Sequence, residues 1–308
     1  MRGVFRPGTF DAGITRYGTS IKEELESVRF AIVHRYVPPE VPDARSSSET
    51  TVRNVMACLR LIRPMRSRAL MMRGEVRDDG TFDVRSYDIP PLYTFEVPTF
   101  QKLFKLRNCD CEELTRLAPD FLRVLSTDEV WKFRMSVQFH ELGHFQSLDW
   151  KARYLLWCSA IESIYTTNNP EHKGTRVAVE RIKCLLGENT SIYPVVEINE
   201  FEKDPNIRLG TVVEELYAVR NYLAHGDRIP DRYFSEQWRE SLSGPVALVE
   251  VLTEAASFII RTTLTKILRE GMLNHFRDEV TAEAYWDAKG LTNNKIRARL
   301  KAVSVGNP

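Results

Sequence analysis

Four apolar stripes at helical spacing, all between residues 150 and 270, constrain the fold of this chain most strongly. Apolar residues that recur every three or four positions place one face of a helix against a core. Helices of this kind can bury their stripes against one another, so the sequence predicts a helical bundle. The stripes consist of Trp150, Tyr154, Trp157, Cys158, Ile161 and Tyr165; of Val179, Ile182 and Leu186; of Leu209, Val212, Val213, Leu216, Val219 and Leu223; and of Val249, Leu252, Ala256, Ile259, Thr263 and Ile267.

The segment before the bundle has a different composition. Residues 37–50 combine three prolines with a serine run, which predicts an extended linker after an N-terminal element at residues 1–36. Helical spacing follows at residues 51–63, and short apolar runs up to Phe100 predict hairpin-like strands. We therefore expect a mostly α protein with a smaller α+β region at residues 51–130, a bundle at 131–271 and a helical tail at 272–308.

Charge and cysteine content narrow the setting. The formal net charge is only +1, so the chain as a whole is not a cationic nucleic-acid binder and any such contact must be local. The five cysteines include Cys158 and Cys184 in apolar helical stretches, where we expect buried free thiols. Since the N-terminus lacks the apolar run of a signal peptide, we expect a cytoplasmic protein with no membrane contact.

The run Phe139–Phe145 matches the H-E-x-x-H pattern of zinc metallopeptidases. In that pattern His140 and His144 would hold zinc and Glu141 would be the general base. Catalytic zinc needs a third protein ligand, and the residues after His144 do not supply the third histidine of the metzincin pattern, so Glu162 would have to serve. Alternatively, Gly143 and the following Ser-Leu-Asp predict a helix end, a loop and an N-cap before the next helix.

A second run, Glu215–Gly226, places Arg220 at the flank of an apolar helix face. A guanidinium there must be paired or stacked, because an unpaired charge beside a core is costly. His225 lies five positions later and would point roughly 140° away from Arg220 on a regular helix. The two side chains can meet only if the helix distorts near Gly226, or if two chains bring their copies together.

The run Glu215–Gly226 resembles the arginine, polar residue, spacer and histidine signature of the HEPN superfamily. Upstream, Leu155–Tyr165 resembles the first core helix of its Apea-like branch. The resemblance covers about 120 of the 308 residues. It implies a four- to five-helix, usually dimeric fold that cuts RNA with no metal or other cofactor.

The resemblance implies roles for individual residues. Histidine, with an unperturbed pKa near 6.5, suits His225 to proton transfer, and arginine suits Arg220 to stabilising the transferred phosphoryl group. Asn221 shares the helix face of His225 and can orient the imidazole or contact the phosphate. Tyr217 either stacks on a base or packs in the core. Glu162 either pairs with Arg220 or is an ordinary exposed glutamate.

We therefore expect a metal-independent endoribonuclease that leaves a 2′,3′-cyclic phosphate, acting as a bacterial toxin or antiviral defence effector. Its expected partners are RNA, a second copy of the chain, and a trigger bound by the N-terminal region. Two alternatives remain open: a HEPN-like module that only binds nucleic acid or protein, and a zinc hydrolase. If the bundle cuts RNA, the basic stretch from Arg53 to Arg77 predicts a backbone-contacting surface that includes Arg60, Arg63, Arg66 and Arg68.

Overall fold

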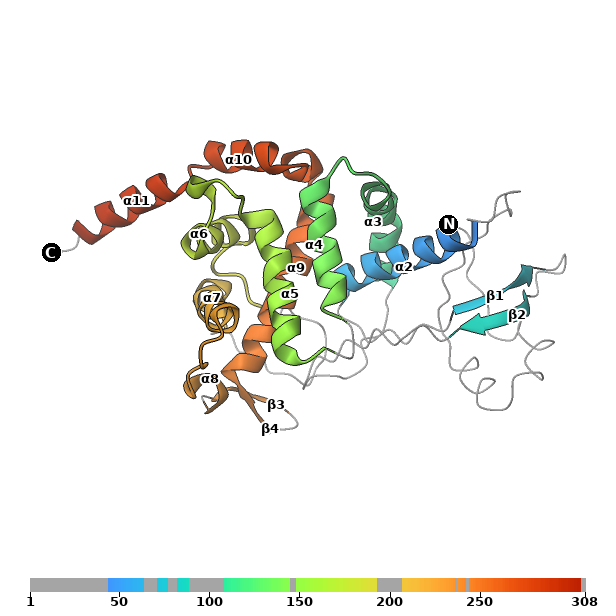
Figure 1. Ribbon diagram of the computed structural model, residues 1–308, viewed down its shortest axis with the longest axis horizontal. Coiled ribbons are helices and arrows are strands. Elements are labelled where there is room, and N and C mark those ends of the chain that lie inside the picture. The colour runs from blue at the N-terminus through green and yellow to red at the C-terminus, as the bar shows by residue number, and fades with distance from the viewer. Residues whose placement is uncertain are drawn as a thin grey trace. The chain divides into compact units, whose positions relative to one another are not determined.

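The computed structural model describes residues 44–63, 71–76, 82–88, 108–144, 148–192, 207–235, 237–241 and 244–305 of the chain (Figure 1). Contacts divide the chain into two units, one of residues 1–56 and 66–94 and the other of residues 57–65 and 95–308. Helices make up most of the described residues, which confirms the prediction of a mostly α protein.

The first unit contains the start of α2 (Ala44–Ile62) and an antiparallel hairpin of β1 (Met71–Val76) and β2 (Phe82–Asp88). Because α2 begins at Ala44, the prediction that the linker extends to residue 50 is wrong. The prolines of that segment all precede Ala44, and the serines that follow do not stop a helix. The wider α+β region remains a prediction, since 31 of its 80 residues lie outside the described ranges.

The second unit is a helical bundle built around α9 (Leu248–Arg269). Buried residues occur on all sides of α9, because other helices surround it. Figure 1 shows α9 beside α5 (Trp150–Tyr165), with α6 (Thr175–Leu186) and α7 (Leu209–His225) to one side and α4 (Trp131–Leu142) to the other. The four predicted stripes lie on α5, α6, α7 and α9, which confirms those four helices.

Local signals in the sequence set the ends of these helices. Gly187 and Gly226 follow α6 and α7 with φ angles of 87° and 73°, in the region that favours glycine. The carboxylate of Asp149 accepts a hydrogen bond from the backbone N–H of Ala152 at 2.8 Å, so Asp149 is the N-cap of α5. The predicted helix end near Gly143 and the N-cap before Trp150 are thereby confirmed.

The predicted boundary between residues 130 and 131 does not separate two units. Helix α3 (Asn108–Ser126) contacts both α4 and α9, and its Phe121 and Val124 have no exposed surface. The end of α2 contributes Cys58 and Leu61 to the same core. The bundle therefore begins before residue 131, because the apolar faces of α2 and α3 are buried against it.

The C-terminal tail is helical through residue 305 and packs on the bundle. It comprises η3 (Met272–Phe276), α10 (Glu279–Ala288) and α11 (Asn293–Val305). The remaining short elements are η2 (Pro170–His172), α8 (Arg232–Ser235), β3 (Gln237–Ser241) and β4 (Gly244–Ala247). None of the described helices is long and apolar enough to cross a lipid bilayer.

The cysteine prediction is half right. Cys158 of α5 is buried, whereas Cys184 of α6 is exposed. Helix α6 turns Ile182 and Leu185 toward the core, and Cys184 lies between them in sequence on a different face. Burial of the apolar stripe therefore does not extend to every apolar residue of the helix.

Arg181 joins the tail to the bundle from a fully buried position on α6. Its guanidinium donates to the carbonyl oxygens of Leu291 at 2.9 Å and Tyr165 at 2.8 Å. It also contacts Nδ1 of His172 at 2.7 Å and lies 5.1 Å from the ring of Trp286. Burial lowers the pKa of Arg181 to about 10, so the side chain is still a cation at neutral pH.

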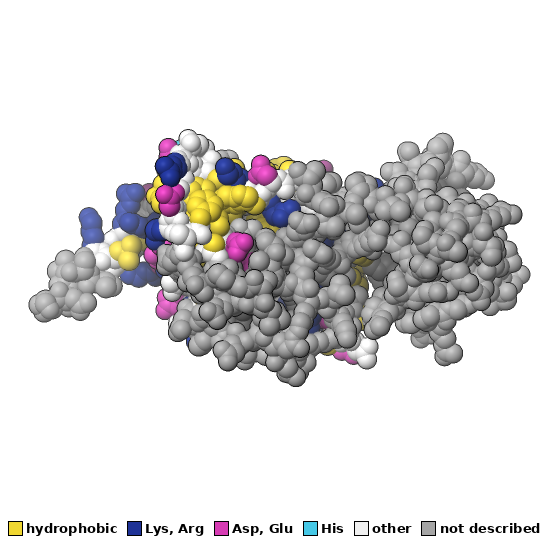
Figure 2. All heavy atoms as spheres, turned by 90° about the horizontal axis from the view of Figure 1, so that it is seen from below, with side chains coloured by type: hydrophobic (Ala, Val, Ile, Leu, Met, Phe, Trp, Pro, Cys, Tyr) yellow, Lys and Arg dark blue, Asp and Glu magenta, His cyan; other side chains and the backbone are white. Residues whose placement is uncertain are grey.

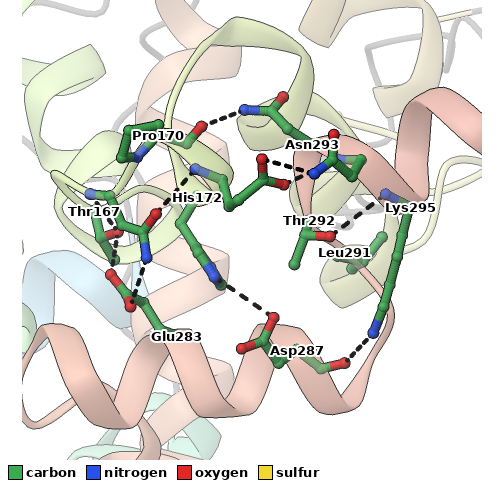
Figure 3. A network of polar contacts seen from close by, with 12 residues as sticks. Thr167, Pro170, His172, Glu283, Asp287, Leu291, Thr292, Asn293 and Lys295 are labelled. Carbon is green, nitrogen blue, oxygen red and sulfur yellow. Dashed lines mark hydrogen bonds and ion pairs between the residues drawn. The ribbon is translucent and has the colours of Figure 1, made fainter.

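Further polar contacts connect the η2 loop to α10 and α11 (Figure 3). The carboxylate of Glu283 accepts hydrogen bonds from Thr167 at 2.7 Å and from Asn169 at 3.1 Å. Nε2 of His172 lies 3.5 Å from the carboxylate of Asp287. Since its Nδ1 faces the Arg181 guanidinium, a neutral ring accepts there and carries its proton on Nε2.

We expect the free energy of unfolding to fall as the pH drops below about 6.5, because burial and then the charge of Arg181 lower the pKa of His172. The unfolded chain takes up the proton first, so the stabilisation is complete above the unfolded pKa and is lost as the pH falls toward the lowered folded pKa. Asp287, Glu283 and Glu171 also face the ring and oppose the shift.

Urea unfolding between about pH 8 and pH 5 measures this effect. The variant His172→Asn has no titrating ring, so its unfolding free energy should depend less steeply on pH than that of the wild type. Other buried histidines titrate in both proteins and cancel in the comparison. Identical slopes in the two proteins would contradict the assignment.

Candidate functional site

Helices α5 and α7 together position the residues of the predicted site. The hydroxyl of Tyr154 on α5 donates to the backbone carbonyl of Leu216 on α7 at 2.8 Å, in the buried contact between the two helices. Glu162 lies two turns after Tyr154, and Arg220 lies one turn after Leu216. The same helix contact that buries Tyr154 therefore brings Glu162 and Arg220 together.

Arg220 pairs with Glu162 across this contact, with 2.9 Å between the guanidinium nitrogen and the carboxylate oxygen. Of the two alternatives for Glu162, pairing with Arg220 is the one present in the structure. The side chains are 28% and 26% exposed, so one edge of the pair faces solvent. A guanidinium held in place by a carboxylate and open on one side can still bind an anion.

Asn221 connects the pair to α6. Its side-chain oxygen accepts a hydrogen bond from Arg220 at 3.3 Å, and its side-chain nitrogen lies 3.5 Å from the hydroxyl of Thr175. The side chain of Asn221 therefore contacts Arg220 and Thr175, and its predicted role in orienting His225 stays a prediction.

His225 is the last residue of α7 and is exposed. The helix is regular up to this residue, and the left-handed turn comes only at Gly226, so the helix does not distort in a way that joins His225 to Arg220. Within the part of the chain that the structure describes, the His225 side chain forms no hydrogen bond or ion pair. Of the two ways for the residues to meet, association of two chains remains.

Of the two alternatives for Tyr217, packing in the core is the one present in the structure. The residue is only 1% exposed, on the buried side of α7. Burial, followed by the nearby Glu162 carboxylate, raises the pKa of Tyr217 well above its ordinary range. Tyr217 is therefore a neutral packing residue, and it lies near the pair of Arg220 and Glu162.

Arg60 and Arg63 are not surface cations, and the prediction that they contact RNA is wrong. Arg60 donates from Nε and Nη2 to the two carboxylate oxygens of Glu141, and the Arg60 side chain is only 6% exposed. Arg63 pairs with Asp110 at 2.7 Å. Carboxylates on α3 and α4 thus neutralise these two arginines, while Arg66 and Arg68 lie outside the described residues.

The H-E-x-x-H residues form a compact buried group on α4. Nε2 of His140 lies 3.2 Å from Nε2 of His144, and donor atoms of His140, Glu141 and His144 all lie within 4.8 Å of one another. Burial lowers the pKa of both histidines, so both rings are neutral near pH 7. A hydrogen bond between two neutral rings accounts for the short distance, provided that one ring donates and the other accepts.

These residues fit a catalytic zinc ion poorly. Burial by itself raises the pKa of Glu141, but the charge of Arg60 and the hydrogen bonds from His140 and Arg60 together outweigh burial and hold that pKa below its ordinary range. A carboxylate bound by a guanidinium is a weak general base, and the guanidinium charge opposes a second cation beside it. Among the described residues, no third histidine, cysteine or further acid joins the group, although catalytic zinc needs one.

The group instead fastens α2 and α4 to α5. The indole N–H of Trp157 donates to the backbone carbonyl of His140 at 3.2 Å, and Arg153 donates to the carbonyl of Gly143 at 3.1 Å. A Cβ atom on Gly143 would lie 2.4 Å from the indole nitrogen, which explains the glycine in the motif. The H-E-x-x-H match is therefore accounted for by packing.

Apolar side chains gather near the end of α7. Figure 2 shows hydrophobic side chains bordered by charged ones on the face seen from below, on which α8 lies. Phe234 of α8 is 48% exposed and meets Trp150 edge to face at a centroid distance of 6.1 Å. Tyr222 and Leu223 of α7 are half-buried beside the core. His225 therefore follows directly on an α7 segment with partly exposed apolar residues.

No protein-family model, curated protein or solved structure matches the chain.

Proposed function

We propose that the bundle is a four- to five-helix HEPN-like domain and a metal-independent endoribonuclease. The observation that carries the proposal is the partly exposed Arg220, held by Glu162 and Asn221, on a helix that ends at the exposed His225. The N-terminal α+β region is a candidate module for binding a trigger. By the same resemblance, we propose a role as a cytoplasmic bacterial toxin or antiviral defence effector.

The proposed reaction uses only side chains and RNA. His225 takes the proton of a ribose 2′-hydroxyl, and the 2′ oxygen attacks the adjacent phosphorus. The bond from phosphorus to the 5′ oxygen breaks, and that oxygen takes up a proton. Arg220 stabilises the negative charge on the pentacovalent species through its open edge. The products carry a 2′,3′-cyclic phosphate and a 5′-hydroxyl.

Replacing Arg220 with glutamine is expected to slow cleavage about 10²–10³-fold, because a cation that stabilises the transition state is removed. Glutamine can still donate to Glu162, which limits the effect on folding. The assay uses purified protein, mixed RNA and EDTA, together with an analysis of bound metal. If EDTA stops cleavage, the result favours the zinc hydrolase. If the Arg220→Gln variant cleaves RNA as fast as the wild type, Arg220 has no catalytic role.

We propose that a homodimer completes the site, because Arg220 and His225 point roughly 140° apart on one regular helix. If each site takes Arg220 from one chain and His225 from the other, mixing Arg220→Gln with His225→Ala gives heterodimers with one intact site. After subunit exchange, the mixture should regain about a quarter of the wild-type activity, since half of its dimers are mixed. No recovery would contradict the shared site.

A module that only binds RNA or protein is the remaining alternative from another class. It would keep the pair of Arg220 and Glu162 as a packing feature of a dimer. It predicts RNA binding or dimerisation without any cleavage, so the assay above separates the two proposals.

A further inference from the structure

A cavity of about 370 Å³ lies between the start of α6 and the start of α11. Three of its lining residues are cations, and none is an acid. Arg297 belongs to a basic run in the tail, with Lys295, Arg299 and Lys301, which the predicted RNA contacts did not include. The lining consists of Lys173, Gly174, Thr175, Arg176, Asn293 and Arg297.

The three cations of this cavity are not neutralised within the described part of the chain. Lys173, Arg176 and Arg297 are exposed, and their side chains take part in none of the ion pairs there. On the neighbouring elements, Glu180 is paired with Arg299 at 2.9 Å, and the carboxylate of Glu171 is turned to Asn294, whose side-chain amide donates to it at 2.9 Å. Like charges around one concavity make it attractive to an anion.

Asn293, at the start of α11, holds the wall of the cavity in place, and Figure 3 shows its contact with Pro170. The side-chain nitrogen of Asn293 donates to the carbonyl oxygens of Pro170 at 2.6 Å and Lys173 at 3.1 Å. These bonds fix the η2 loop against the start of α11. Lys173 therefore sits on a loop that is already ordered, which lowers the entropy lost on binding a ligand.

The cavity is also next to the proposed catalytic residues. Thr175 lines it, and the hydroxyl of Thr175 lies 3.5 Å from the side-chain nitrogen of Asn221. Asn221 in turn accepts a hydrogen bond from Arg220. A chain of two direct contacts thus joins the lining of the cavity to the arginine that would contact the scissile phosphate.

We propose that this cavity binds a backbone phosphate of the RNA strand, next to the phosphate that is cut at Arg220. The inference rests on the proposed ribonuclease function and adds the surface that positions its substrate. Arg176 and Arg297 present planar guanidinium groups that suit phosphate oxygens, and Lys173 adds a compact charge. Backbone contacts of this kind set the register of a strand without reading its sequence.

Binding of a 2′-O-methyl RNA strand tests the inference, because that strand cannot be cut through a 2′-hydroxyl. The variant Lys173→Gln, Arg176→Gln, Arg297→Gln should raise the Kd at least about tenfold at low salt. Its plot of log affinity against log salt should be shallower by about 0.7, since the cavity binds one phosphate and each phosphate neutralised on a single strand contributes about 0.7.

The matched control removes the same charge elsewhere, through Arg116→Gln and Arg123→Gln on α3 and Arg277→Gln just after η3. It should change the Kd by less than about threefold, because exposed charges far from the strand are screened by salt. Equal weakening by both triple variants, or no weakening by the cavity variant, would overturn the inference.

Cleavage of unmodified RNA by the wild type separates this inference from the function on which it rests. Suppose that the wild type cuts no RNA, and that the cavity variant binds the methylated strand more weakly than the wild type and the control variant do. The phosphate cavity then stands and the proposed function fails. If the wild type cuts RNA and the cavity variant binds and cuts equally well, the function stands and the cavity is excluded.

Discussion

Replacing His225 with alanine is expected to slow RNA cleavage by about 10²–10⁴-fold, the range that a positioned acid or base contributes. The free energy of unfolding should change little, because the His225 side chain is exposed at the end of α7. Single-turnover cleavage measures the rate, and urea unfolding measures the stability. The loss should also remain at saturating RNA concentration, since the step affected is chemical.

His275→Ala is the matched control for this prediction. His275 is also exposed, but it lies on η3 and contacts Tyr285 with a ring-centroid distance of 4.9 Å. Its removal should leave the cleavage rate unchanged. If both histidine variants cleave RNA at the wild-type rate, His225 is not the acid or base.

Replacing Arg181 with methionine should lower the free energy of unfolding by about 3–5 kcal/mol, the largest effect on stability that we expect from one substitution. Methionine fills much of the volume but donates no hydrogen bond. The carbonyl oxygens of Leu291 and Tyr165 would lose their charged donor, and each buried acceptor left without one costs about 1–3 kcal/mol. Chemical denaturation measures the loss.

Arg176→Met is the control for this substitution on the same helix. Arg176 is exposed and takes part in no ion pair among the described residues, so its unfolding free energy should change by less than about 0.5 kcal/mol. An equal effect of both substitutions, or none for Arg181→Met, would show that the buried network does not hold the tail on the bundle.

The central helices could be predicted from the sequence because their apolar residues follow a regular spacing and glycine marks their ends. The stripe of Leu209–Leu223 and the following Gly226 define α7 without any tertiary information. The pairing of Glu162 with Arg220 needed the relative placement of two helices, and the sequence could only leave it as one of two alternatives.

The roles of the basic residues could not be predicted in this way. The sequence places Arg60 in a basic run, and its carboxylate partner Glu141 is distant in the chain. Conversely, Lys173, Arg176 and Arg297 come from two separate stretches, and only the fold gathers them around one cavity. Long-range pairing decides whether an arginine is a structural ion-pair partner or a surface cation.

Cleavage of a defined RNA in EDTA, with analysis of the product ends, tests the central claim most directly. Replacing the ribose at the cleaved position with 2′-deoxyribose should abolish cleavage there, because the attacking hydroxyl is missing. The wild type should leave a 2′,3′-cyclic phosphate and a 5′-hydroxyl, and the Arg220→Gln and His225→Ala variants should cleave the RNA at least about a hundredfold more slowly. Cleavage of the deoxy-substituted strand, or products with a 5′-phosphate, would contradict the account.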